Sequence, residues 1–246
     1  MTERRTLGPS PRVLVLIPAY NEANSLPRVI DELHAQMPDA DVLVVDDAST
    51  DETPRLLQEL DVKWLRLSQR LGTGAAVKAG LRYATSLGYR VVVRVDGDGQ
   101  HPANAIAQVL APVLGGRADV AIGSRYATGK SPRTPWLRRL GHRGLGAILT
   151  LLAGRRVTDP TSGFWAFGPH ALRVLAEHHP SGYPEPELVL FLSRNALHVV
   201  EVPVTMRDRI AGQTSLTPQR TGIAFARLLL LLVIVPLRSA VGGSHD

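Results

Sequence analysis

The chain has 246 residues, 44% of them hydrophobic, which is typical of a globular protein and long enough for one α/β domain with a sizeable core. It contains no cysteine, which excludes a disulfide framework, a thiol nucleophile and a cysteine zinc site, and fits a reducing compartment. The formal net charge of +6 favours phosphate-bearing substrates, anionic membrane surfaces or nucleic acid as partners.

The N-terminal part predicts a tail followed by alternating strands and helices. Residues 1–11 are expected to be a flexible tail, and no apolar stretch follows their charges, so no secretory signal is predicted. Residues 12–17 read as a strand ended by Pro18, and apolar residues at helical spacing predict a helix over 25–36. A second strand, 42–45, leads into an acidic stretch in which Asp51 and Glu52 either face a ligand or cap a helix over 52–60.

Two more strands complete a parallel pattern. Residues 63–67 predict a short strand, and Gly72 and Gly74 open a helix over 75–87, where free amides can bind phosphate or glycine can allow close packing. Four strands alternating with helices indicate a Rossmann-like, mostly parallel sheet. Because Pro18 stands where the first glycine of a GxGxxG motif would be, we exclude a dinucleotide-binding oxidoreductase.

The fourth strand carries the strongest chemical signal. Residues 91–95 are apolar except for Arg94, and the strand ends in Asp96-Gly97-Asp98-Gly99. Two carboxylates one residue apart after a buried strand suit a hard divalent cation such as Mg²⁺ or Mn²⁺, which completes its shell with water and substrate phosphates. The alternative is an acidic turn with solvated carboxylates.

Several motifs occur together in one order along residues 12–216. They are Ile17-Pro18-Ala19-Tyr20-Asn21-Glu22, Asp46-Asp47-x-Ser49-x-Asp51-x-Thr53, Gly72-x-Gly74, Asp96-Gly97-Asp98-Gly99-Gln100-His101-Pro102, Gly123-Ser124-Arg125, Asp159-Pro160-Thr161-Ser162-Gly163-Phe164 and Glu201-Val202-Pro203-Val204 with Arg209-x-x-Gly212. Together they resemble the GT-A fold of family 2 glycosyltransferases, and most closely the dolichol-phosphate (polyprenyl-phosphate) mannosyl- or glucosyltransferases.

This resemblance implies a nucleotide-sugar site and its metal. Asp47 would read the base or ribose, and Asp96 and Asp98, joined by Gln100, would hold the metal on the donor diphosphate. The implied nucleotide-binding positions are Pro18, Ala19, Tyr20, Asn21, Glu22, Asp47, Gly74, Lys78, Asp96, Gly97 and Arg209. Asn21 could instead serve only as a turn former, and Gln100 only as a helix-start residue.

The acceptor side is less defined by the sequence. Asp98, Arg125 and Asp159 are the predicted catalytic residues, with Asp159 a general base if the acceptor is a hydroxyl; a phosphate acceptor is already anionic and needs none. Residues 127–135 predict a loop over the site. A helix over 136–152 carries arginines that either bind an acceptor phosphate or form a solvated face, and either of two glutamates could face the acceptor (Arg138, Arg139 and Arg143; Glu185 and Glu187).

Two departures from the family pattern bear on the acceptor. Trp165 follows Ser-Gly-Phe where the family often has arginine, and Ser215 stands where the lipid-phosphate branch tends to place lysine. Two missing cations weaken the case for a lipid phosphate specifically and leave the donor site untouched.

The C-terminal part, 217–246, predicts an apolar helix and a tail. Its ten apolar positions, 228–237, are about half of the roughly 20 that a membrane span needs, so we expect an interfacial helix, a core helix or a dimer face. The expected protein is cytoplasmic, either peripheral on the membrane or free.

The expected function is metal-dependent transfer of a hexose from a GDP- or UDP-sugar, with polyprenyl phosphate as first-choice acceptor. The alternatives are a nucleotide-sugar mutase that rearranges pyranose and furanose rings, and a non-catalytic nucleotide-sugar binding module. Nucleic-acid binding is not expected, because no aromatic residues interleave with the basic ones.

Overall fold

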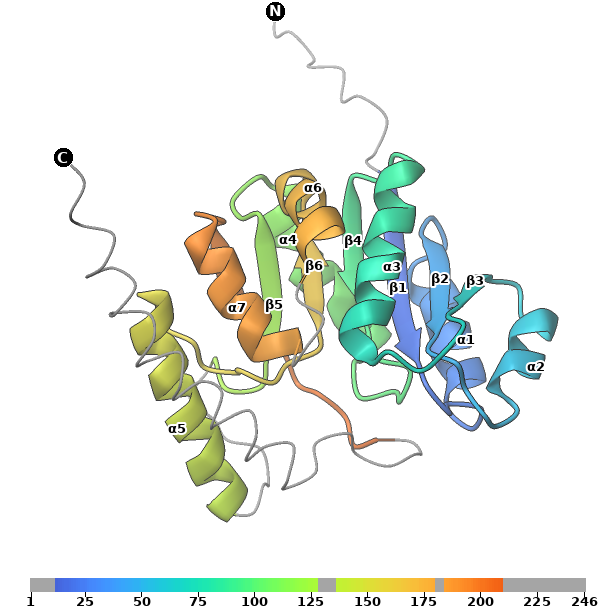
Figure 1. Ribbon diagram of the computed structural model, residues 1–246, viewed down its shortest axis with the longest axis horizontal. Helices are drawn as coiled ribbons and strands as arrows, with labels where there is room; N and C mark the ends of the chain where they lie inside the picture. The colour runs from blue at the N-terminus through green and yellow to red at the C-terminus, as the bar shows by residue number, and fades with distance from the viewer. Residues whose placement is uncertain (1–11, 128–135, 180–183, 210–246) are drawn as a thin grey trace, which may run out of the picture.

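The computed structural model describes residues 12–127, 136–179 and 184–209, and its centre is one seven-stranded sheet (Figure 1). The strand order is β3-β2-β1-β4-β6-β5-β7. All neighbouring pairs are parallel except the two made by β6, which is antiparallel to β4 and to β5. The strands are β1 (Val13–Ala19), β2 (Asp41–Asp46), β3 (Lys63–Arg66), β4 (Val91–Arg94), β5 (Val120–Ser124), β6 (Trp165–Phe167) and β7 (Val199–Pro203).

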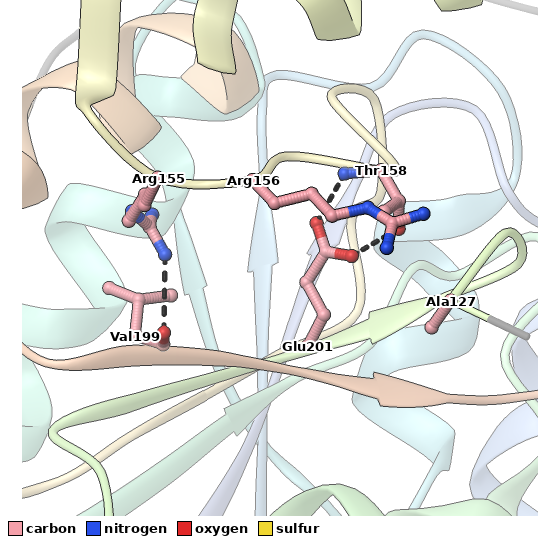
Figure 2. Close-up of a pocket in the computed structure, with 6 residues that line it drawn as sticks. All are labelled: Ala127, Arg155, Arg156, Thr158, Val199 and Glu201. Atoms are coloured by element: carbon pink, nitrogen blue, oxygen red, sulfur yellow. Dashed lines mark hydrogen bonds between the residues drawn. The ribbon is translucent and has the colours of Figure 1, made fainter. Parts of the chain in front are cut away.

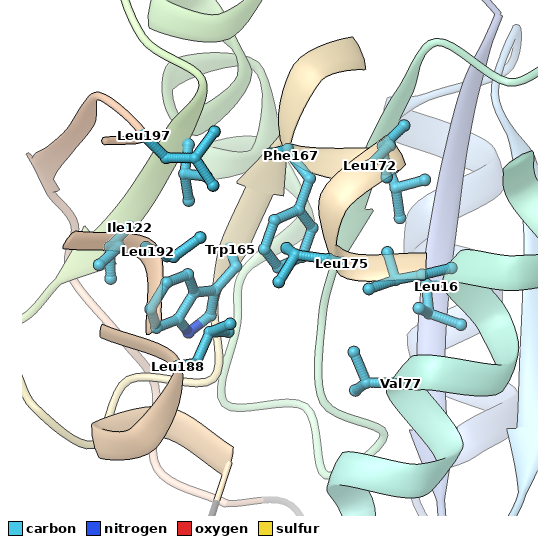
Figure 3. Close-up of a cluster of buried hydrophobic side chains, with 14 of the residues drawn as sticks. Leu16, Val77, Ile122, Trp165, Phe167, Leu172, Leu175, Leu188, Leu192 and Leu197 are labelled. Carbon is cyan, nitrogen blue, oxygen red and sulfur yellow. The ribbon is translucent and has the colours of Figure 1, made fainter. Parts of the chain in front are cut away.

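Helices cover both faces of this sheet. They are α1 (Leu26–Gln36), α2 (Thr53–Glu59), α3 (Thr73–Ser86), a 3₁₀ turn (Ala103–Ala105), α4 (Ile106–Leu114), α5 (Trp136–Ala153), α6 (Pro169–His178) and α7 (Pro184–Arg194). Side chains alternate along each strand, so Leu14 and Leu16 belong to the core on the face covered by α3, α5, α6 and α7, whereas Val15 and Ile17 belong to the core on the face covered by α1, α2 and α4. Figure 3 shows the first of these cores, with Trp165 and Phe167 at its centre.

The sequence prediction of an α/β fold with a mostly parallel sheet is confirmed. The first four strands and their three helices lie where expected, with ends shifted by one or two residues. One difference has a clear cause: β1 continues through Pro18 to Ala19, because its pairing with β4 ends at Leu16 and the missing amide of Pro18 therefore needs no partner on that side.

The sheet topology brings the predicted motifs to one edge. The carboxyl ends of the six parallel strands lie together, and the amino end of antiparallel β6 joins them, so that residues 159–164 lie beside the loops that follow β4 and β5. In the part of the chain that the structure describes, no helix is long and apolar enough to cross a membrane. The predicted tail at 1–11, residues 128–135 of the predicted loop at 127–135, and the segment 217–246 lie outside the described residues.

Candidate functional site

Asp96 follows β4 and is held from both sides. Its carboxylate Oδ1 accepts a hydrogen bond from Arg94 Nη2 at 3.1 Å, and its backbone amide donates to Nδ1 of His101 at 2.9 Å. Burial lowers the pKa of His101 to about 4, so this ring is neutral near pH 7 and can accept that proton. Burial is the largest single influence and would raise the pKa of Asp96, but the Arg94 guanidinium and other nearby groups together outweigh it and hold this pKa below the ordinary value.

Gly163 allows the Asp96 side chain to take this position. A Cβ atom at residue 163 would lie 2.4 Å from Oδ2 and 2.9 Å from Oδ1 of Asp96, closer than van der Waals contact permits. The Ser162-Gly163-Phe164 motif therefore supports the site physically. Ser162 Oγ donates to the Gly123 carbonyl at 2.6 Å, and the Phe164 ring stacks on His101 with 4.9 Å between centroids.

Asp98 and Glu22 form the second half of this acidic cluster. Asp98 Oδ1 accepts from the Gln100 amide at 2.9 Å, and its Oδ2 lies 3.0 Å from Arg209 Nη2. Burial and the neighbouring Asp96 carboxylate raise the pKa of Asp98. Burial likewise raises the pKa of Glu22 to about 7, although Glu22 Oε2 accepts a hydrogen bond from Ser25 at 2.8 Å.

These residues fit a hard divalent cation. Asp96 and Asp98 offer oxygen ligands, and a cation between them would relieve the repulsion that raises the Asp98 pKa. Within the described residues, no histidine or further acid joins Asp96 and Asp98 to make a metal site of three side chains. Water and a substrate diphosphate would therefore have to fill the remaining positions around the cation. Gln100 contacts Asp98 through its backbone amide, and its predicted role as a ligand stays a prediction.

The nucleotide side lies at the ends of β1 and β2. Asp47 is 3% exposed, and its two carboxylate oxygens accept from the amides of Leu71 and Gly72 at 2.7 and 2.8 Å. Asp47 therefore fixes the loop that leads into α3. The guanidinium of Arg70, in the same loop, stacks 3.9 Å from the ring centroid of Tyr20.

Other predicted nucleotide-binding residues have structural contacts of their own. Asn21 has a positive φ of 57°, and its side-chain oxygen accepts from the Thr50 amide at 2.8 Å, which supports the turn-former interpretation. Asp51 Oδ1 accepts from the Thr53 amide at 3.0 Å, which supports its interpretation as a helix cap. Pro18 and Ala19 end β1, Gly97 lies beside Glu22, and Gly74 and Lys78 lie in the first two turns of α3.

Arg125 and Asp159 form a two-point ion pair on the predicted acceptor side. The carboxylate of Asp159 is fully buried and accepts three hydrogen bonds from Arg125: from its amide at 3.0 Å, from Nε at 2.8 Å and from Nη2 at 2.8 Å. A two-point contact of this kind fixes the guanidinium plane. With three hydrogen bonds from Arg125 and a longer one from Thr161 Oγ1 at 3.5 Å, the Asp159 carboxylate is better placed to orient that arginine than to accept a proton.

Trp165, the first of the two departures from the family pattern, has a structural role. Trp165 is fully buried, and its indole donates to the Ser162 carbonyl, so it belongs to the core. Its cross-strand neighbour is Arg94, which supplies a buried guanidinium at this place in the sheet. Sequence analysis missed this role, although a lone charge in an apolar strand before two acids was a usable signal.

Several acceptor-side predictions are not tested by the structure. Ser215 and the side chains of Arg138, Arg139 and Glu185 lie outside the described residues. Arg143 is exposed on α5, and Glu187 lies in the first turn of α7.

Known proteins are similar to this chain in sequence and in fold. The model of the family described as "Glycosyl transferase family 2" matches residues 14–175. Polyprenol monophosphomannose synthase from Mycolicibacterium smegmatis is 34% identical, over 86% of this chain and 83% of its own. UDP-N-acetylglucosamine–dolichyl-phosphate N-acetylglucosaminyltransferase from Methanococcus voltae is 32% identical, over 78% of this chain and 84% of its own.

A solved structure agrees with the sequence comparisons at the level of the fold. Glucosyl-3-phosphoglycerate synthase from Mycobacterium tuberculosis, in complex with Mn²⁺, uridine diphosphate and phosphoglyceric acid, superimposes with a TM-score of 0.64 at 21% identity and covers 82% of this chain and 72% of that one. With the family model matching most of the chain and both acids of the site at the sheet edge, the chain belongs to family 2 of the glycosyltransferases and has their GT-A fold.

Proposed function

We propose that this enzyme transfers a hexose from a nucleoside diphosphate sugar to a polyprenyl phosphate, with a divalent metal. The observation that carries the proposal is the pair Asp96 and Asp98 at the carboxyl edge of the sheet, where Arg94 contacts Asp96 and Arg209 contacts Asp98, beside the Arg125–Asp159 pair. The acceptor follows from the two relatives, whose names give a polyprenol and a dolichyl phosphate at over 30% identity.

On the donor side, Asp96 and Asp98 would hold Mg²⁺ or Mn²⁺, which would offset the charge on the departing nucleoside diphosphate. Arg209 lies against Asp98 and can contact the same diphosphate. Tyr20, Arg70 and the loop fixed by Asp47 would surround the base. The relatives differ in the sugar that their names carry, so sugar and base are left open by this proposal.

On the acceptor side, a phosphate oxygen attacks the anomeric carbon of the sugar. The bond from that carbon to the diphosphate breaks, and its electron pair leaves with the nucleoside diphosphate. Because the phosphate is already anionic, no proton has to be removed, and the buried, fully paired state of Asp159 is compatible with this reaction. Arg125 would orient the acceptor phosphate, and peripheral contact with the membrane would give access to the lipid.

The test measures nucleoside diphosphate released from UDP- and GDP-sugars with Mn²⁺, with and without undecaprenyl phosphate. Release should need the lipid, and Asp98→Ala should abolish it, whereas Asp61→Ala, at an exposed position, should not. Formation of an isomeric nucleotide sugar without acceptor, and of no lipid-linked sugar with it, would instead establish the rearrangement reaction.

A further inference from the structure

A pocket of about 220 Å³ opens beside the edge strand β7 and shares no lining residue with the Asp96–Asp98 site. Figure 2 shows that its walls come from the loop after β5, the segment after α5, and strand β7. It is lined by Ala127, Arg155, Arg156, Thr158, Val199 and Glu201.

Arg155 forms the inner wall and is incompletely bonded. Its Nε donates to Ser193 Oγ at 3.1 Å and its Nη1 to the Val199 carbonyl at 3.3 Å (Figure 2). Its Nη2 is buried and has no hydrogen-bond partner among the described residues. Burial lowers the pKa of Arg155, which Glu201 partly opposes. A buried donor without an acceptor costs free energy, and an anion that reached it would remove this cost.

Arg156 supplies a second cation at the rim. Its side chain is exposed and extends across Thr158 in Figure 2, and no hydrogen bond or ion pair joins it to another described residue. It can therefore turn to a ligand without breaking a hydrogen bond or ion pair to a described residue.

The one acid of the pocket is already engaged. Glu201 Oε1 accepts from the Thr158 amide at 2.7 Å, and its Oε2 accepts from the Thr158 hydroxyl (Figure 2). The Asp159 amide lies 3.4 Å from the same Oε1. Two guanidinium groups and one satisfied carboxylate leave a net positive charge, and arginine forks match the geometry of phosphate oxygens.

We propose that this pocket binds a phosphate group in addition to those of the donor and acceptor, either free phosphate or the headgroup of an anionic lipid. Its position gives such a ligand contact with the acceptor side. Thr158 Oγ1 lies 2.8 Å from Ser124 Oγ. Thr158 also directly precedes Asp159, the residue that orients Arg125. A bound phosphate would thus stabilise the segment that fixes Arg125.

The test compares wild type, Arg156→Gln, Arg156→Lys and a control, Arg82→Gln, which changes an exposed arginine on α3 that forms no ion pair with another described residue. Thermal unfolding is followed while inorganic phosphate replaces chloride at constant ionic strength, because a ligand of the native state raises its apparent stability. Co-sedimentation with vesicles of phosphatidylcholine, with and without phosphatidylglycerol, tests the lipid source.

If the pocket binds a phosphate group, Arg156→Gln should weaken binding of the phosphate probe about tenfold, because one charge-assisted contact is lost. Arg156→Lys should keep most of the wild-type affinity, and Arg82→Gln should bind as wild type does. This pattern with inorganic phosphate assigns the pocket to free phosphate, and the same pattern only with phosphatidylglycerol assigns it to a lipid headgroup. Equal effects of Arg156→Gln and Arg82→Gln, or no binding of either probe to wild type, would overturn the proposal.

Discussion

Asp159→Asn distinguishes an aspartate that orients Arg125 from one that removes a proton. The substitution keeps the shape of the side chain but replaces one acceptor oxygen by a donor, which would face the Nε or Nη2 donors of Arg125. The carboxylate is fully buried and Arg125 is 21% exposed, so water can compensate only the arginine, and only in part.

The expected loss of stability follows from this geometry. Removing one partner of a buried ion pair costs about 3–5 kcal/mol, and the partial exposure of Arg125 places this pair near the lower end, at about 3 kcal/mol. For a chain of this length, each kcal/mol corresponds to roughly 2–4 °C in Tm. The Asp159→Asn protein should therefore unfold about 6–12 °C below wild type.

The assay is a double-mutant cycle with Asp159→Asn, Arg125→Gln and the double variant, read by thermal unfolding and by lipid-dependent release of nucleoside diphosphate. If the two residues act as one unit, the double variant should lose little more activity and stability than either single variant. Asp61→Asn, an exposed change, serves as the control. Losses that simply add, or a Tm within about 2 °C of wild type for Asp159→Asn, would refute the orienting role.

Three further changes test other parts of the fold and site. Gly163→Ala would place a Cβ 2.4 Å from Asp96 Oδ2, so we expect Mn²⁺-dependent nucleotide binding, measured by calorimetry, to fall at least about tenfold; unchanged binding would contradict the Asp96 assignment. Asp47→Ala frees the loop before α3 and should weaken nucleotide binding by about 1–3 kcal/mol in the same titration, and equal affinity would remove Asp47 from the site. The pKa of Asp41 is lowered, chiefly by its hydrogen bond to Lys63. The Asp41 carboxylate should therefore stabilise the folded protein above about pH 4, and this stabilisation should be lost as the pH falls through the lowered pKa. Urea unfolding should show a stability difference from Asp41→Asn at pH 7 that decreases as the pH is lowered below about 4, and a difference that does not change with pH would argue against the Asp41–Lys63 pair.

The sequence allowed the parallel half of the sheet to be predicted because local signals determine it. Strands β1, β2 and β4 are largely apolar runs, β3 is a short strand between two helices, and acidic residues end β2 and follow β4. Strand β6 carries no such signal: it has three residues, and its partners β4 and β5 both precede it along the chain. A short antiparallel strand inserted between two parallel ones depends on tertiary packing, which periodicity does not encode.

The same limit explains which site residues were found. Asp96, Asp98 and Arg125 stand in motifs whose spacing is visible along the chain, whereas some of their partners come from distant segments: Arg209 contacts Asp98, and Asp159 contacts Arg125. Arg94 became interpretable only when the register placed it opposite Trp165, with its guanidinium on Asp96. A buried arginine would destabilise an apolar strand unless a carboxylate met it, so the charge that interrupts β4 and the acid that ends it are best explained as one unit. The orientation of the predicted metal ligand thus depends on a residue that the motif itself does not contain.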